Sequence, residues 1–310
     1  MRAVKRLIAL FTLLLLAACA STTTVTDKRI ALTFDDIPRD RGAWLGDDER
    51  TRRLIAGLRE AGVSQAAFFL NPGRIREKPG AEARIAAYAA AGHVLANHTA
   101  THPHLNVTEP RAYLAEIDAA EAWLKGRPGY RPWFRFPYLD EGQNDLAKRD
   151  AIRAGLAARE LKNGYVTVDA SDWFYEQAAI DAMKAGRRID RDALRELYIE
   201  SHVESAEFTD ALARRTLGRS PAHVLLLHET DLAAFWIADL VRALEANGWT
   251  IVSADEAFAD PIAQFVPDVP VAQGTLIEAI AWQQGLPEPR WYPRNNTEVA
   301  GRLFQERVLK

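Results

Sequence analysis

The sequence predicts an α/β protein whose strands form a parallel sheet, closed or nearly closed into a barrel. Short apolar segments alternate with helical ones, and seven such strands can be counted between residues 30 and 252. Strands separated by helices pair in parallel, because each helix carries the chain back across one face of the sheet. With 310 residues the chain is also long enough to bury a full core.

In the first half of the chain, each apolar segment ends at residues that favour a turn. Residues 30–37 alternate like a buried strand, and Pro38 blocks further pairing. Asp47 or Asp48 can cap the helix that follows, which Gly62 ends. The other strands and helices expected in this half are 66–70, 81–91, 93–96, 109–125, 133–136 and 144–154.

The second half continues this pattern with strands at 165–168, 224–227 and 249–252 and a helix at 232–246. Residues 174–220 interrupt the pattern with a long polar helical segment, which we interpret as an insertion packed outside the barrel. Beyond residue 259 the chain is rich in proline, with one helical stretch near 275–282. We therefore expect a domain of residues 29–259 followed by a C-terminal extension, 260–310.

The N-terminus is typical of a processing signal. Arg2, Lys5 and Arg6 precede an apolar stretch that is too short to be a comfortable membrane span. Residues 16–19, Leu-Ala-Ala-Cys, resemble the lipobox of bacterial lipoproteins. This predicts a signal peptide of residues 1–18, lipidation of Cys19 and a tether of residues 19–28. No aspartate follows Cys19, which by the same resemblance favours an outer-membrane anchor facing the periplasm.

The composition excludes several classes of protein. The formal net charge of -3 becomes -6 without Arg2, Lys5 and Arg6, when 36 basic residues remain against 42 acidic ones. Nothing in this balance points to a nucleic-acid partner. Cys19 is the only cysteine, so an intramolecular disulfide framework is excluded.

Two adjacent carboxylates, Asp35 and Asp36, stand at the end of the first strand. Neighbouring strand residues point to opposite faces, so the two acids need not do the same job. In an α/β sheet or barrel, the carboxyl ends of the strands form the edge where ligands bind. Taken alone, the pair is more typical of a strand followed by a polar turn.

Two histidines, His98 and His102, follow the strand expected at 93–96. Imidazoles four residues apart can face one point if the chain turns helically. With one carboxylate from the aspartate pair they would complete a ligand set for zinc or a similar divalent ion. Alone, this spacing is more typical of two polar loop histidines.

Three further clusters lie at strand ends. They are 131–138, containing Arg135, Pro137 and Tyr138; 169–173, containing Asp172 and Trp173; and 224–228, which ends in His228. Taken separately, they could be an aromatic strand with a surface arginine, a polar turn with a half-buried tryptophan, and a lone histidine. All of them fall at the same end of their strands as the first two clusters, which favours a common site.

Together these clusters resemble the polysaccharide deacetylase family, the NodB-homology domain of carbohydrate esterase family 4. The motifs that match are Thr33-Phe34-Asp35-Asp36, His98-Thr99-x-x-His102, Arg135-x-Pro137-Tyr138, Asp169-x-x-Asp172-Trp173 and Leu225-Leu226-Leu227-His228. They occur in the family's order across about residues 29–258. The resemblance implies a distorted (β/α)7 barrel.

The resemblance also implies a role for each residue. Asp36, His98 and His102 would hold a divalent metal, zinc above all or otherwise cobalt, nickel or manganese, which polarises the acetyl carbonyl and binds the attacking water. The catalytic residues would be Asp35 as general base, Arg135 as its partner, His228 as general acid and Asp172 as the partner of that histidine. Tyr138 would stabilise the oxyanion through its N–H, and the substrate would contact Tyr138, Trp173 and Pro137.

Several residues depart from the family pattern or match none of it. Ile37 and Leu139 stand where glycine is common, and Glu229 stands where aspartate is more usual. They suggest a reshaped groove and bear on the substrate more than on the chemistry. The four remaining histidines match no motif, and we expect them to be structural or solvated: His93, His104, His202 and His223.

The resemblance implies a metal-dependent hydrolase that removes acetyl groups from an N-acetylglucosamine-containing polysaccharide, either peptidoglycan or an exopolysaccharide. An O-acetyl esterase acting on acetylated xylan or another glycan is a second reading, and a non-sugar amide is a weaker variant. A third reading is a catalytically silent glycan-binding lipoprotein of the envelope. A silent relative would be expected to lose a metal ligand, the base or the acid, and here none is missing.

Overall fold

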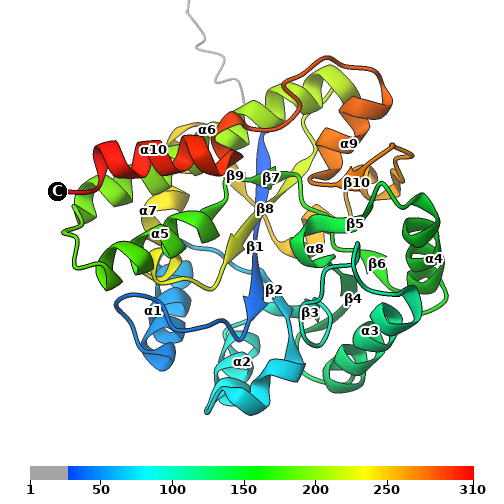
Figure 1. Ribbon diagram of the computed structural model, residues 1–310, viewed down its shortest axis with the longest axis horizontal. Coiled ribbons are helices and arrows are strands. Elements are labelled where there is room, and N and C mark those ends of the chain that lie inside the picture. The colour runs from blue at the N-terminus through cyan, green and yellow to red at the C-terminus, as the bar shows by residue number, and fades with distance from the viewer. Residues whose placement is uncertain (1–26) are drawn as a thin grey trace, which may run out of the picture.

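The computed structural model describes residues 27–310 (Figure 1). The predicted signal peptide, Cys19 and most of the tether lie outside the described residues. Eight strands form the main sheet, in the order β6-β4-β3-β2-β1-β8-β7 with β9 paired to β1, and all pairings in it are parallel. Their bounds are β1 Arg29–Ile37, β2 Ala67–Leu70, β3 Val94–Asn97, β4 Tyr130–Phe134, β6 Lys162–Asn163, β7 Val168–Asp169, β8 Ala222–His228 and β9 Thr250–Ile251.

The sheet confirms the predicted α/β barrel fold in an incompletely closed form. β1 lies at its centre because both neighbours pair along it, β8 from Arg29 to Asp35 and β2 from Thr33 to Ile37. β6 and β7 stand at the two ends of the strand order and do not pair with each other. The barrel is therefore open between them.

Two strands begin three residues away from their expected starts, and β6 was not predicted. β4 is Tyr130–Phe134 instead of 133–136, and β7 is Val168–Asp169 instead of 165–168. In the second case the reason is a competing partner, because the carbonyl of Val166 accepts a hydrogen bond from the backbone N–H of Leu276 at 2.8 Å. The C-terminal extension thus takes up a backbone group that the sequence pattern assigned to the barrel.

Helices cover the sheet and account for the regular alternation of the sequence. Those of the barrel are α1 Asp47–Glu60, α2 Ala81–Ala90, α3 Pro110–Leu124, α4 Leu146–Ala157, α7 Asp231–Ala246 and α8 Ala254–Phe258. Short 3-10 turns η1 Pro72–Glu77, η2 Pro137–Leu139, η3 Pro261–Gln264 and η4 Pro293–Asn295 lie between them and in the extension. Gly46, and neither Asp47 nor Asp48, is the N-cap of α1, and the two aspartates lie in its first turn.

The segment 174–220 contains most of α5 Asp172–Lys184 and all of α6 Arg191–Leu217. The extension adds β10 Ala272–Gln273, α9 Leu276–Gln283 and α10 Thr297–Arg307. In Figure 1 α10 lies along α5 and α6 on one side of the molecule, while β10 lies on the other side beside β5 Asp140–Gln143. β10 and β5 pair antiparallel, so the extension contacts two separate parts of the molecule, the helices α5 and α6 and the strand β5.

The core between the sheet and its helices contains a stack of aromatic rings. Phe68 of β2 is fully buried, with ring centroids 4.9 Å from Phe34 and 4.0 Å from Tyr88. We expect Phe68→Ala to lower the free energy of unfolding by about 3–5 kcal/mol, because it leaves a cavity in a close-packed core. Urea unfolding followed by circular dichroism measures this, and Val107→Ala, at a side chain 79% exposed, should change stability by less than about 0.5 kcal/mol.

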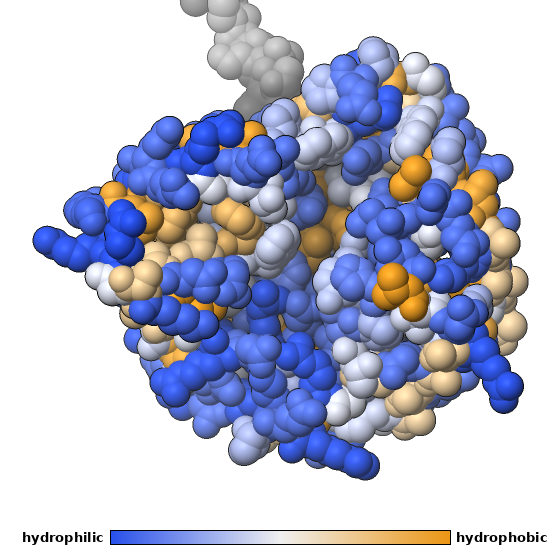
Figure 2. All heavy atoms as spheres, in the orientation of Figure 1, coloured by the Kyte–Doolittle hydropathy of each residue, from blue (hydrophilic) through white to orange (hydrophobic). Residues whose placement is uncertain are grey.

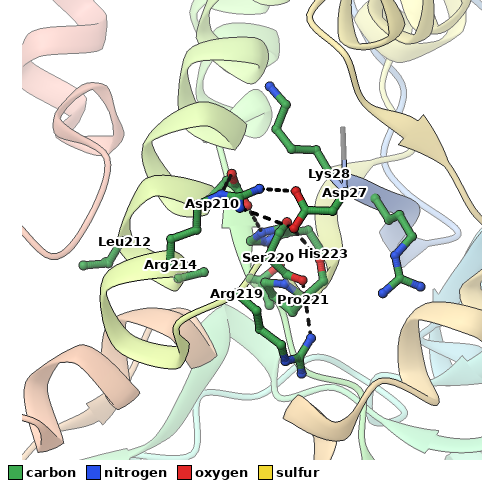
Figure 3. Close-up of polar contacts among 12 residues, drawn as sticks. Asp27, Lys28, Asp210, Leu212, Arg214, Arg219, Ser220, Pro221 and His223 are labelled. Atoms are coloured by element: carbon green, nitrogen blue, oxygen red, sulfur yellow. Dashed lines mark hydrogen bonds and ion pairs between the residues drawn. The ribbon is translucent and has the colours of Figure 1, made fainter. Parts of the chain in front are cut away.

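Polar side chains close the end of the barrel where the strands begin (Figure 3). Arg214 of α6 pairs with both Asp27 and Asp210, and Asp210 lies 3.3 Å from Nε2 of the buried His223. His93, which directly precedes β3, and His202 of α6 are also buried. Within residues 27–310, no helix combines the length and the apolar character needed to cross a bilayer.

Candidate active site

The aspartate pair ends β1, and both carboxylates reach one cavity. Strict alternation would send them to opposite faces of the sheet. Asp36 instead has a left-handed backbone, with φ of 69°, which breaks the alternation of side chains near the end of the strand. As a result Nε2 of His98 lies 3.8 Å from Oδ2 of Asp35 and 3.5 Å from Oδ1 of Asp36. The two side chains therefore do not point to opposite faces, although their different partners still leave room for different roles.

His98 and His102 converge without the helical turn that their spacing suggested. Residues 98–102 are irregular, and Thr99 and His102 have φ values of 65° and 67°. Nε2 of His102 lies 2.9 Å from Oδ1 of Asp36, and the two imidazole centroids are 4.8 Å apart. One ligand atom from each of Asp36, His98 and His102 falls within 4.8 Å of the others.

This group fits a divalent metal ion. Oδ1 of Asp36 is buried, and no hydrogen bond of good geometry reaches it, although two imidazole nitrogens lie near. Nδ1 of His98 lies 2.9 Å from the carbonyl of Arg135, which selects the tautomer that leaves the Nε2 lone pair facing the carboxylate. Three lone pairs directed at one point, two of nitrogen and one of oxygen, form a ligand set suited to zinc and its neighbours.

The electrostatics favour an ionised carboxylate in this group. Burial alone would raise the pKa of Asp36, but the contacts with His102 and His98 and the charge of Arg39 hold it well below its usual range. Arg39 pairs with the other oxygen, Oδ2. Oδ1 is thus the oxygen left to face the two histidines.

Arg135 holds the other carboxylate. Its guanidinium is buried and donates through Nη1 to Asp35 Oδ1 and to Thr33 Oγ1, both at 2.7 Å. Nε donates to the carbonyl of Gly164 at 2.7 Å, and the guanidinium carbon lies 3.9 Å from the centroid of Phe69. Arg135 therefore has a fixed orientation, and it leaves Oδ2 of Asp35 directed into the cavity.

His228 and Asp172 form a second buried pair. Asp172 accepts the backbone N–H of His228 at 2.8 Å and faces its Nδ1 at 2.6 Å, so the carboxylate grips both the chain and the ring. Burial alone would lower the pKa of His228, but the charge of Asp172 raises it above its ordinary value. The pKa of Asp172, which burial alone would raise, is lowered by the same pair. Nε2 of His228 lies 3.9 Å from Oδ2 of Asp36 and thus faces the group of possible metal ligands.

This pair yields a pH prediction. A general acid at His228 must be protonated, so activity should fall as pH rises through its pKa. Asp172→Asn removes the charge that raises this pKa, and we expect the alkaline limb of the profile of kcat/KM to move to lower pH. The acidic limb should stay in place. An alkaline limb unchanged by the substitution would contradict the assignment of His228.

The three metal-ligand candidates, together with Asp35 and His228, line one cavity of about 540 Å³, whereas Arg135 and Asp172 are buried and do not line it. Figure 2 shows this face of the molecule hollowed near its centre, with hydrophilic side chains around the opening. Tyr138, 48% exposed, and Trp173, 39% exposed, lie in the cavity wall. Pro137 is buried and is not among the lining residues, so it shapes the turn η2 that presents Tyr138.

Sequence reasoning missed several lining residues. His104, which we expected to be structural or solvated, lines the cavity and stacks on Tyr138 with ring centroids 3.3 Å apart. Three arginines also line the cavity: Arg39, Arg41 and Arg74. Gln273 lines it from the C-terminal extension. The only available signal was proximity, since Arg39 and Arg41 follow the aspartate pair closely. No local pattern marks Gln273.

A family model described as polysaccharide deacetylase matches residues 22–158. A chitooligosaccharide deacetylase from Rhizobium leguminosarum bv. trifolii is 36% identical over 169 residues, which cover 52% of this chain and 68% of that protein. The chain belongs to the polysaccharide deacetylase family. The resemblance inferred from the five motifs is thereby confirmed.

Other relatives match over shorter stretches or by fold alone. A peptidoglycan-N-acetylglucosamine deacetylase from Bacillus cereus is 36% identical over 118 residues, 38% of each chain, so the match spans well under half of that protein. A solved polysaccharide deacetylase from Bacillus cereus superposes with a TM-score of 0.50 at 20% identity, covering 73% of this chain and 91% of that one. A pseudoenzyme of carbohydrate esterase family 4 from Bacillus anthracis, in a mutant with restored activity, gives a TM-score of 0.50 at 17% identity and covers 75% of this chain and 68% of that one.

Proposed function

We propose that this protein is a metal-dependent deacetylase that hydrolyses the N-acetyl groups of an N-acetylglucosamine-containing glycan, peptidoglycan or an exopolysaccharide. One observation carries the proposal. A metal-ligand group of Asp36, His98 and His102 lies in a single cavity with Asp35 and His228. Each of these two side chains is paired with a buried partner, Asp35 with Arg135 and His228 with Asp172. The names of the two curated relatives, both sugar deacetylases, support the substrate class.

The residues of the chain divide the hydrolysis between them. A divalent ion, zinc above all, held by Asp36, His98 and His102 would polarise the acetyl carbonyl and acidify water. Asp35 would accept the proton of the attacking water at Oδ2, because its other oxygen is held by Arg135. Arg135 thereby orients the carboxylate of Asp35 and supplies the positive charge that pairs with it.

The second ion pair would serve the leaving group. As the C–N bond breaks, the sugar nitrogen needs a proton, which protonated His228 would donate from Nε2 while Asp172 holds Nδ1. The products are acetate and the free amine. The backbone N–H of Tyr138 would stabilise the oxyanion, and Tyr138 and Trp173 would flank the sugar ring.

The same groups could hydrolyse an O-acetyl ester, as in acetylated xylan, because water attacks either carbonyl. Acetate release separates the two activities when the metal-loaded protein is given N-acetylglucosamine oligomers and acetylated xylan in parallel. Release from the amino sugar supports the proposal. Release of acetate from xylan alone would identify the protein as an O-acetyl esterase instead.

A catalytically silent glycan-binding protein is the alternative from a different class. One chain of similar fold is a mutant of a pseudoenzyme with restored activity, so the fold alone does not establish catalysis. This chain keeps the base, the acid and all three metal ligands in contact with their partners. Glycan binding without acetate release from any acetylated substrate would favour the silent protein.

We also propose that a lipid on Cys19 anchors the protein to the envelope, at the outer membrane facing the periplasm. Ion pairs of Asp27 with Arg214 and of Lys28 with Glu207 fix the start of the described chain at the end of the barrel where β1 begins. β1 then runs about 20 Å from Arg29 to Asp35 at roughly 3.3 Å per residue. The cavity would therefore open away from the anchored end. Fractionation tests the anchor: the full chain should stay with membranes, and Cys19→Ser should release it.

A further inference from the structure

One part of the wall of the catalytic cavity carries three arginines and one carboxylate, that of Asp40. Arg39 and Arg41 contribute to it from the loop between β1 and α1, and Arg74 contributes from η1. The protein as a whole carries a net charge of -3, so this wall does not simply reflect an excess of basic residues. It is a local feature of the cavity.

The three arginines differ in their partners. Arg39 pairs with Asp36, and Arg74 donates to Oδ2 of Asp40 at 3.0 Å. Arg41 is exposed and forms no ion pair or hydrogen bond with any residue in the range 27–310. Its guanidinium is therefore available to a ligand in the cavity.

Buried groups hold the backbone on both sides of Arg41. Arg50 donates to the carbonyl of Asp40 at 2.9 Å and to that of Arg39 at 3.3 Å. On the other side, Oδ2 of Asp231 accepts the N–H groups of Trp44 and Leu45 at 2.7 and 2.9 Å. The loop is thus anchored before and after Arg41, which reduces the conformational entropy lost when its side chain binds.

Close packing adds a third anchor at Gly42. A side chain there would meet Oε1 of Glu176 and the carboxylate of Asp231, each at 2.4 Å, so the backbone lies directly on these acids. Glu176 is buried and accepts the backbone N–H groups of Asp231 and Leu232 at 3.4 and 3.2 Å. Its oxygens are occupied at the start of α7, which explains why this nearby carboxylate is no partner of Arg41.

We propose that Arg41 binds a carboxylate carried by the substrate on a sugar next to the acetylated one, so that the cavity prefers acidic glycans to neutral ones. A guanidinium presents paired N–H donors that match the two oxygens of a carboxylate. The carboxylate can belong to the lactyl ether of a muramic-type sugar or to a uronic acid. This inference rests on the proposed function, because it takes the cavity to bind an acetylated glycan.

The test compares glycans that differ in charge. The probes are the N-acetylglucosamine tetramer, an alternating N-acetylglucosamine and N-acetylmuramic acid tetrasaccharide, its methyl ester, and an alternating N-acetylglucosamine and glucuronic acid tetrasaccharide. The protein variants are Arg41→Gln and the control Arg76→Gln. Arg76 is exposed on the same turn as Arg74, has no described partner and does not line the cavity. The first readout is KM for acetate release. The second is Kd, measured by calorimetry in an Asp35→Asn background so that the glycan is not hydrolysed during the titration.

Arg41→Gln should weaken binding of at least one acidic tetrasaccharide about fivefold at low salt, and leave the tetramer and the methyl ester unchanged. Its kcat should stay at the native value, and the effect should shrink as salt rises. The acidic tetrasaccharide whose binding is weakened identifies the kind of sugar that carries the carboxylate. An unchanged ratio of acidic to neutral affinity, or an equal change in Arg76→Gln, would overturn the inference. If no glycan releases acetate, the proposed function fails, and the Kd ratio still decides the role of Arg41.

Discussion

Asp35→Asn is expected to reduce kcat for acetate release at least about 100-fold, because general-base catalysis typically contributes 10²–10⁴-fold. Asparagine keeps the shape of the side chain but cannot take a proton from water. Zinc should still bind, since Asp35 lies beside the ligand group without belonging to it. The measurements are acetate release at saturating substrate and zinc binding by calorimetry on the same preparation.

The same substitution also removes the charged partner of a buried guanidinium. Arg135 is 1% exposed, and leaving its charge unpaired is expected to cost about 3–5 kcal/mol of unfolding free energy. Circular dichroism must therefore show that the variant is folded under assay conditions. The control is Asp255→Asn, which breaks another aspartate–arginine pair, with Arg131, outside the cavity. A folded Asp35→Asn protein with native kcat would rule out Asp35 as the base.

His98→Ala is expected to weaken zinc binding by more than about 100-fold and to abolish acetate release at micromolar zinc. Loss of a group that merely supports a ligand typically costs 10–100-fold in metal affinity, so loss of a ligand itself should cost more. Zinc affinity is measured by competition with a chromogenic chelator, which is a readout independent of activity.

His104→Ala is the matched control for this variant. Its imidazole lines the same cavity and stacks on Tyr138 but does not belong to the ligand group. Zinc affinity should stay within about twofold of the native value, as expected for a side chain outside the first coordination shell and without a hydrogen bond to a ligand. Equal losses in His98→Ala and His104→Ala would show that the metal is held elsewhere.

The sequence was sufficient for the architecture because its signals are local. The alternation in residues 30–37 marks β1, and parallel pairing then places the ends of β1, β3 and β8 at one edge. Asp35, His98 and His228 follow from that placement. The motifs add Arg135 and Asp172, whose partners the structure shows.

The remaining features depend on contacts that no short pattern contains. Asp36 reaches the same cavity as Asp35 because of one left-handed residue, which alternation cannot anticipate. β10 forms by pairing with β5, more than a hundred residues earlier, so the proline-rich extension shows no strand signal of its own. Arg41 is unremarkable in sequence, and only the cavity and the anchored loop distinguish it from other surface arginines.

Metal dependence of acetate release tests the central claim most directly. The protein lacking residues up to Cys19 would be stripped with chelator, assayed on the N-acetylglucosamine pentamer, and assayed again after one equivalent of zinc is restored. We expect no acetate above background from the stripped protein and full release on restoring zinc, with half-saturation near one ion per chain. Equal release by the stripped and the zinc-loaded protein would contradict the account.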